Sequence, residues 1–224
     1  MTDIFNNLDW SILTGALLSI IPALLCITIH ELAHGLTAYR LGDNTAKDMG
    51  RLTLNPLKHI DIFGLIMMAV FRFGWAKPVP VNMRRFKHPK RYMAITALAG
   101  PVSNLIMAIV VLFIYGVTYE ILGGVYSTGL KRVILDIIIR AAYLNVALAV
   151  FNLVPIPPLD GSKVLFSLIS DEAYFKLMAY EKYGMILLIV FNSTKYFGMT
   201  VGQVTTSIFN GLRAVADFAY RMVN

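Results

Sequence analysis

Long apolar segments alternate with short polar loops along this chain. Four segments, over residues 11–41, 93–119, 131–154 and 183–205, come close to or exceed the roughly 20 helical residues that cross a bilayer. Each of them predicts a membrane helix. The first becomes amphipathic only in its last turns, where histidine, glutamate and arginine interrupt an otherwise apolar pattern.

A further apolar stretch, residues 62–71, carries no charge but is too short to span a bilayer. It lies between two loops, residues 40–59 and 76–92, that both have the excess of lysine and arginine typical of cytoplasmic loops. If residues 60–75 crossed the membrane, one basic loop would face the wrong side. We therefore predict that this segment is re-entrant or interfacial, with extended backbone around the prolines that follow it.

The C-terminal third has a less regular pattern. Residues 164–182 mix charged and apolar positions, which predicts an amphipathic helix on the surface. Residues 183–224 are expected to form a last span and an amphipathic tail. The predicted fold class is an all-α polytopic membrane protein, a bundle of about four to six transmembrane helices with a re-entrant or extended segment after the first helix. Residues 1–224 are expected to form a single membrane-embedded domain.

Composition supports a membrane protein. Of 224 residues, 57% are hydrophobic and 15% charged, against roughly 45–50% and 25% in soluble domains, and the mean hydropathy is +0.66. The net charge of +7 comes from basic loops beside apolar segments, so it reflects membrane orientation and does not indicate nucleic-acid binding. Cys26 is the sole cysteine, which excludes an intrachain disulfide and a thiolate zinc site.

The first predicted helix carries the sequence His30-Glu31-Leu32-Ala33-His34, an HExxH motif. Histidines at positions i and i+4 lie on one face of a helix, where both rings can bind a single Zn²⁺. Glu31 then lies beside the metal, placed to accept a proton from water. Ionisable groups this close to hydrocarbon cost roughly 2–3 kcal/mol each and usually mark function, so the motif predicts a zinc site within a membrane helix.

A catalytic zinc needs a third protein ligand and one open position. The metzincin pattern requires a glycine at position 37 and a histidine at position 40, but Thr37 and Arg40 stand there, so that family is excluded. A glutamate ligand is hard to supply, because the remaining glutamates flank the predicted spans: Glu120, Glu172 and Glu181.

A better candidate for the third ligand follows the third long apolar segment, in the sequence from Asn152 to Gly161. Its three prolines must end the helix, and Gly161 permits a turn from which Asp160 can face the histidines. With residues 60–75 re-entrant, His34 and Asp160 both lie near the cytoplasmic ends of their helices. The alternative is that Asp160 is only a turn or N-cap residue of the next helix.

Three ordered motifs together resemble the site-2 proteases, the zinc-dependent intramembrane metalloproteases. They are HExxH at residues 30–34, Gly-Pro-x-x-Asn at 100–104 and Asn-x-x-Pro-x-Pro-x-x-Asp-Gly at 152–161. The resemblance covers about residues 12–170. Many members carry a PDZ or CBS domain, for which this chain has no room, so it is expected to be a minimal form.

The resemblance implies roles for individual residues. One Zn²⁺ per chain would be held by His30, His34 and Asp160, with Glu31 as general base. Asn152 becomes a candidate for holding the polarised carbonyl or the oxyanion. Asn104 has two open interpretations, a hydrogen bond between helices or a contact with substrate.

The resemblance also implies hydrolysis of peptide bonds within or near transmembrane segments of membrane protein substrates. Residues 44–58 and 74–83 would hold the substrate as an added strand. The expected location is a prokaryotic plasma membrane, with the active site nearer the cytoplasmic face.

The alternatives are a zinc-binding membrane transporter and a non-proteolytic scaffold. Glu31 has no evident task in a carrier, and no residue of the inferred catalytic set is missing, which disfavours both. Among the other polar residues, His59 and His88 are expected to be solvated in loops, and Asp136 to pair with Arg140 one turn away.

Overall fold

The structure is a computed structural model that describes residues 10–64 and 75–223. These residues form helices and loops, with no strand among them. Among these described residues, three helices are long and apolar enough to cross a membrane: α2 (Trp10–Arg40), α5 (Pro89–Ile121) and α6 (Gly129–Asn152). They confirm the first three predicted spans and the all-α polytopic membrane fold.

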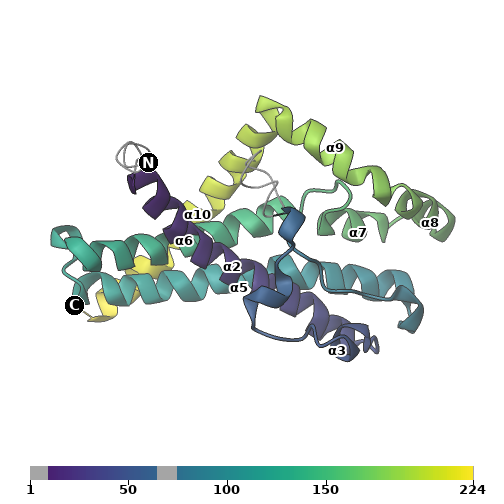
Figure 1. The fold of residues 1–224 in the computed structure, drawn as a ribbon, viewed down its shortest axis with the longest axis horizontal. Coiled ribbons are helices and arrows are strands. Elements are labelled where there is room, and N and C mark those ends of the chain that lie inside the picture. The colour runs from purple at the N-terminus through teal and green to yellow at the C-terminus, as the bar shows by residue number, and fades with distance from the viewer. Residues whose placement is uncertain (1–9, 65–74, 224) are drawn as a thin grey trace, which may run out of the picture.

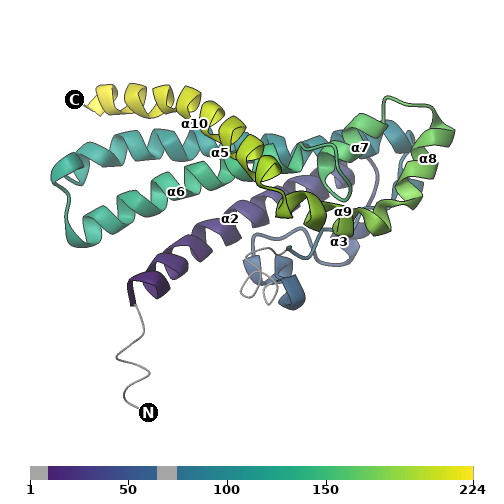
Figure 2. The ribbon, with the colours of Figure 1, turned by 90° about the horizontal axis from the view of Figure 1, so that it is seen from above.

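The predicted fourth span is wrong as a continuous helix. The chain forms α9 (Glu181–Ser193) and α10 (Lys195–Val223), which meet at 84° (Figures 1 and 2). The break is at Thr194, whose backbone is extended and whose hydroxyl oxygen accepts the backbone N–H of Phe197, so it caps α10. The described residues therefore contain three candidate spans, or four if the bent pair is one span, and four is the lower end of the predicted number.

The predicted amphipathic helix over residues 164–182 is also divided. It consists of the end of α7 (Asp160–Phe166) and of α8 (Asp171–Ala179). The hydroxyl of Ser170 accepts the backbone N–H of Ala173 and so begins a new helix. The charged residues of α8 are exposed, as expected for a surface helix.

The bundle is built on a hairpin of α5 and α6, joined through the short helix η3 (Gly124–Tyr126), with α2 packed against both. Figure 2 shows α10 lying along the same pair. Leu112 of α5, Ala142 of α6 and Ala216 of α10 form the centre of the apolar core. At Gly116, a Cβ atom would lie 2.2 Å from the carbonyl oxygen of Ala216, so the absence of a side chain lets α10 approach α5.

In the part of the loop between α2 and α5 that the structure describes, short helices include α3 (Thr45–Asp48), η1 (Pro56–His59) and η2 (Met83–Arg85). Residues 44–58 are therefore not extended throughout, and their role in holding a substrate strand stays a prediction. Asp43 ties this loop together, because its fully buried carboxylate accepts the backbone N–H groups of Thr45 and Asn82.

The predicted re-entrant segment, residues 60–75, lies mostly outside the described residues. Its two flanks contact each other, because the backbone N–H of Lys77 donates to the carbonyl oxygen of His59 at 2.9 Å. The Arg51 guanidinium donates to the carbonyl of Lys77 at 2.8 Å. The residues just before and just after this segment therefore lie next to each other.

Two smaller predictions are wrong. His59 is buried rather than solvated. Its ring Nε2 lies 3.0 Å from the carbonyl oxygen of Thr53, so a backbone group takes the place of water. Asp136 pairs with Arg132, one turn towards the N-terminus, at 3.3 Å, rather than with Arg140. His88 is exposed, as expected.

Candidate metal centre

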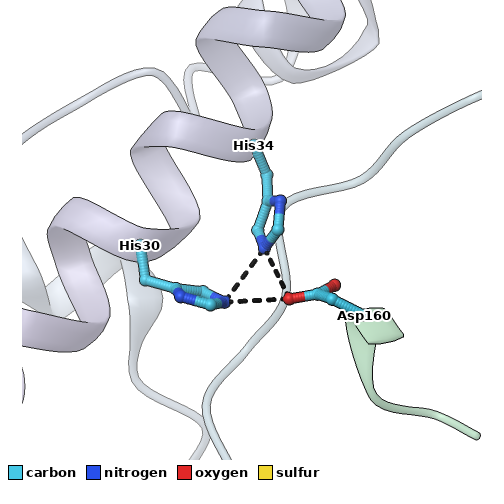
Figure 3. A group of neighbouring side chains, drawn as sticks. All are labelled: His30, His34 and Asp160. Atoms are coloured by element: carbon cyan, nitrogen blue, oxygen red, sulfur yellow. Dashed lines mark hydrogen bonds and ion pairs between the residues drawn. The ribbon is translucent and has the colours of Figure 1, made fainter. Parts of the chain in front are cut away.

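The two histidines of the HExxH motif lie side by side on α2, and their Nε2 atoms are 3.0 Å apart. Asp160, the first residue of α7, faces both of them (Figure 3). Its Oδ2 is 3.2 Å from Nε2 of His30 and 3.1 Å from Nε2 of His34. All three side chains are buried. Residues 130 positions apart in sequence thus meet in one cluster.

The tautomer of His30 follows from its contact with Asn104 on α5. Asn104 donates its amide N–H groups to the carbonyl oxygen of Cys26 and to the side-chain oxygen of Asn145. Its own side-chain oxygen therefore faces Nδ1 of His30 and can only accept. Nδ1 of His30 carries the proton, which leaves a lone pair on Nε2.

His34 is oriented in the same way by a backbone group. Its Nδ1 lies 2.7 Å from the carbonyl oxygen of Thr96, which can only accept a hydrogen bond. The lone pair of His34 is then also on Nε2. Such a hydrogen bond behind a ring is the usual means of fixing the tautomer of a metal-binding histidine.

Asp160 supplies the negative charge of the cluster. Burial alone would raise the pKa of its carboxyl, but contacts with the His30 and His34 rings, and the nearby charge of Lys163, outweigh burial and hold that pKa well below its usual range. These contacts therefore favour the ionised form of Asp160.

The geometry fits a bound zinc ion. Two nitrogen lone pairs and one carboxylate oxygen converge, and they would repel one another without a cation between them. The three atoms are 3.0–3.2 Å apart. Ligands bonded to a tetrahedral zinc at about 2.0–2.1 Å lie about 3.3 Å apart, and two imidazoles with one carboxylate are a common set in catalytic sites. Among the described residues, this is the one group of His, Cys, Asp and Glu side chains so arranged.

The Gly-Pro-x-x-Asn motif on α5 supports the cluster from behind. A Cβ atom at Gly100 would lie 2.4 Å from Nε2 of His34 and 2.6 Å from Cε1 of His30, so only glycine admits both rings. Asn104 follows one turn later and is fully buried. Of its two interpretations, the structure supports the hydrogen bond between helices.

The bend that carries Asp160 differs from the prediction in detail. Leu159, not Asp160, is the N-cap of α7, so the alternative that Asp160 is a capping residue is wrong. Gly161 lies inside α7 rather than in a turn. A Cβ atom there would lie 2.2 Å from the carbonyl oxygen of Leu153, so glycine lets α7 pack against the end of α6.

Beside the cluster lies a cavity of about 340 Å³ that Glu31 and Asn152 also line. Oε2 of Glu31 accepts the backbone N–H of Val79 at 2.7 Å, so the loop before α5 borders the cavity. Asn152, at the end of α6, donates one amide N–H to the carbonyl oxygen of Leu148. The structure thus brings all five predicted site residues to one place.

Sequence reasoning did not assign to the site two charged residues that also line the cavity, Lys163 and Glu181. Lys163 lies three residues after Asp160, and this spacing could have indicated it. Glu181 was set aside because it flanks a predicted span. It reaches the cavity because α9 folds back onto the proline bend, where a Cβ at Gly184 would lie 2.5 Å from the carbonyl oxygen of Pro157.

Comparison with known proteins gives the family. The model of peptidase family M50 matches residues 124–191, which include Asp160. A Bacillus subtilis (strain 168) protein named "Putative zinc metalloprotease YwhC" is 45% identical over 177 residues, or 76% of this chain and 78% of the relative. The chain belongs to peptidase family M50, the site-2 proteases.

More distant relatives carry similar names. "Putative zinc metalloprotease Rip2" of Mycolicibacterium smegmatis is 29% identical over 171 residues, and the chain spans 63% of its length. "Putative zinc metalloprotease MJ0611" of Methanocaldococcus jannaschii is 31% identical over 162 residues, 72% of this chain and 75% of the relative. No solved structure matches the chain. M50 membership and these names support a membrane-bound zinc metalloprotease of the site-2 type.

Proposed function

We propose that this M50 peptidase hydrolyses peptide bonds within or near transmembrane segments of membrane proteins. The observation that carries the proposal is the buried triangle of His30, His34 and Asp160. Its two histidines and the neighbouring Glu31 lie on α2, a helix apolar enough to span a membrane. Residues 1–224 would act as one membrane-embedded domain in a prokaryotic plasma membrane, with the site nearer the cytoplasmic face.

In this proposal, Nε2 of His30, Nε2 of His34 and Oδ2 of Asp160 hold one Zn²⁺ per chain. Bound zinc supplies Lewis acidity, which lowers the pKa of water and polarises a carbonyl group. The hydrogen bonds behind the histidines, from His30 to Asn104 and from His34 to Thr96, keep both rings in the orientation that presents a lone pair.

Glu31 is the proposed general base. Its Oε2 is held by the Val79 N–H, and its other oxygen remains for a proton from the attacking water. As the new carbon–oxygen bond forms and the peptide carbon–nitrogen bond breaks, Glu31 passes that proton to the leaving nitrogen. The amine then leaves neutral rather than as a strongly basic anion.

Asn152 is the proposed donor to the substrate carbonyl. Its amide nitrogen has two N–H groups, of which one donates to the carbonyl of Leu148. Because Asn152 lines the cavity, its second N–H is the proposed donor to substrate. A donor placed where negative charge develops on oxygen lowers the barrier to attack.

The test is removal and return of the metal. Purified protein in proteoliposomes is given a single-span peptide substrate, and cleavage products are identified by mass spectrometry. We expect a soluble zinc chelator to abolish cleavage and added Zn²⁺ to restore it, whereas the chelator already saturated with zinc should have no effect. Zinc flux without any cleavage would favour the transporter, and neither flux nor cleavage would favour the scaffold.

The Asn104→Ala variant tests the support of His30. Without the acceptor behind the ring, His30 loses its fixed tautomer, and we expect zinc affinity to fall by about 10- to 100-fold. Equilibrium dialysis against a competing chelator measures this. Asn210→Ala is the matched control, because Asn210 is exposed on α10. Equal zinc affinity in both variants would show that Asn104 does not orient the ligand.

A further inference from the structure

A chain of alternating charges continues outward from the metal cluster. Oδ2 of Asp160 faces the histidines, and its second oxygen, Oδ1, lies 4.0 Å from Nζ of Lys163. On its other side, Nζ of Lys163 lies 3.8 Å from Oε1 of Glu181. The Lys163 side chain is only 18% exposed, so its charge is balanced mainly by these two carboxylates.

The two ends of this chain come from different parts of the fold. Asp160 and Lys163 are one turn apart on α7, whereas Glu181 is the first residue of α9. The contact between Gly184 and Pro157 sets the position of α9 against the proline bend. Glu181 can therefore reach Lys163 only when α9 is seated on that bend.

A carboxylate can bind zinc through one oxygen or through both. Binding through both would occupy a coordination position that a catalytic zinc needs for water or substrate. An ammonium group near Oδ1, here at 4.0 Å, favours binding through Oδ2 alone, because its positive charge attracts the charge of the second oxygen away from the metal. Groups that contact a ligand in this way set its orientation and the affinity of the site.

We propose that Lys163 is a positioning residue that keeps Asp160 bound through Oδ2 alone, and that Glu181 holds Lys163 in this place. The proposal rests on the metal assignment made above. It also links α9 to the metal: displacement of α9 from the proline bend would free Lys163 and allow Asp160 to rotate.

The test replaces zinc with Co²⁺, whose visible absorption weakens when a four-coordinate site gains a fifth ligand. We expect Lys163→Met to weaken this absorption and to lower zinc affinity by about tenfold. Lys163→Arg should retain most of the Co²⁺ absorption and most of the zinc affinity, because it keeps the positive charge. Glu181→Gln should change both in the same direction as Lys163→Met, by a smaller amount. Lys176→Met, at an exposed position on α8, is the matched control and should match the wild type.

Different outcomes separate this proposal from the proposed function. If the wild type binds no Co²⁺, or if Asp160→Ala leaves its spectrum unchanged, the metal assignment itself fails. If the wild type binds Co²⁺ through Asp160 and both Lys163→Met and Glu181→Gln retain its spectrum and affinity, the positioning role is wrong. Should Lys163→Met not fold, an unchanged spectrum in Glu181→Gln overturns the role of Glu181, and a Lys163→Gln variant then decides that of Lys163.

Discussion

Replacing Glu31 with glutamine is expected to lower the rate of peptide cleavage by about 100- to 10,000-fold, the range that a positioned general base contributes. The substitution preserves the shape of the site. The glutamine side-chain oxygen can still accept the Val79 N–H, as Oε2 of Glu31 does. What is lost is the ability to take a proton, because an amide is not a base at neutral pH.

The expected signature of Glu31→Gln is lost turnover with zinc retained. None of the three atoms of the metal triangle belongs to Glu31, so zinc measured by elemental analysis should stay at the wild-type level. Single-turnover cleavage of a single-span substrate gives the rate. Glu120→Gln makes the same chemical change at an exposed position near the end of α5 and should cleave normally. A Glu31→Gln enzyme within threefold of the wild-type rate would remove Glu31 from the mechanism.

The metal cluster could be predicted because its signals are local. The spacing of His30 and His34 fixes their shared helix face, and the prolines before Asp160 fix the end of a helix. The three long spans follow from apolar length alone. Each of these inferences uses residues near one another in sequence.

Features that depend on contacts between distant segments could not be predicted. The helix breaks at Thr194, where one hydroxyl caps the next helix. The apolar stretch around Thr194 predicted a single continuous helix. Glu181 enters the cavity only because α9 turns back onto Pro157. Gly161 was taken for a turn residue, because the sequence does not show that Leu153 would lie against it. Close backbone approach leaves no periodic signal along the chain.

Among these close contacts between distant segments, the one at Gly100 should have the largest effect on zinc affinity. Elsewhere in an exposed helix, replacing glycine with alanine stabilises the fold by roughly 0.5–1 kcal/mol. At Gly100 the new methyl group would lie 2.4 Å from Nε2 of His34, well inside the normal contact distance of about 3.5–4.0 Å. The ring of His34 cannot move aside freely, because the Thr96 carbonyl on the same helix holds its Nδ1.

We therefore expect Gly100→Ala to lower zinc affinity by about 100-fold, since it displaces both imidazoles at once. Gly211→Ala on α10 is the matched control, because no described atom lies within 4 Å of a Cβ placed there. It should bind zinc like the wild type and be no less stable. Zinc titration of both variants, with thermal unfolding to confirm that they fold, separates a blocked site from a damaged helix. Normal zinc affinity in a folded Gly100→Ala protein would mean that α5 does not pack against the histidines, and the geometry of the metal centre would have to be redrawn.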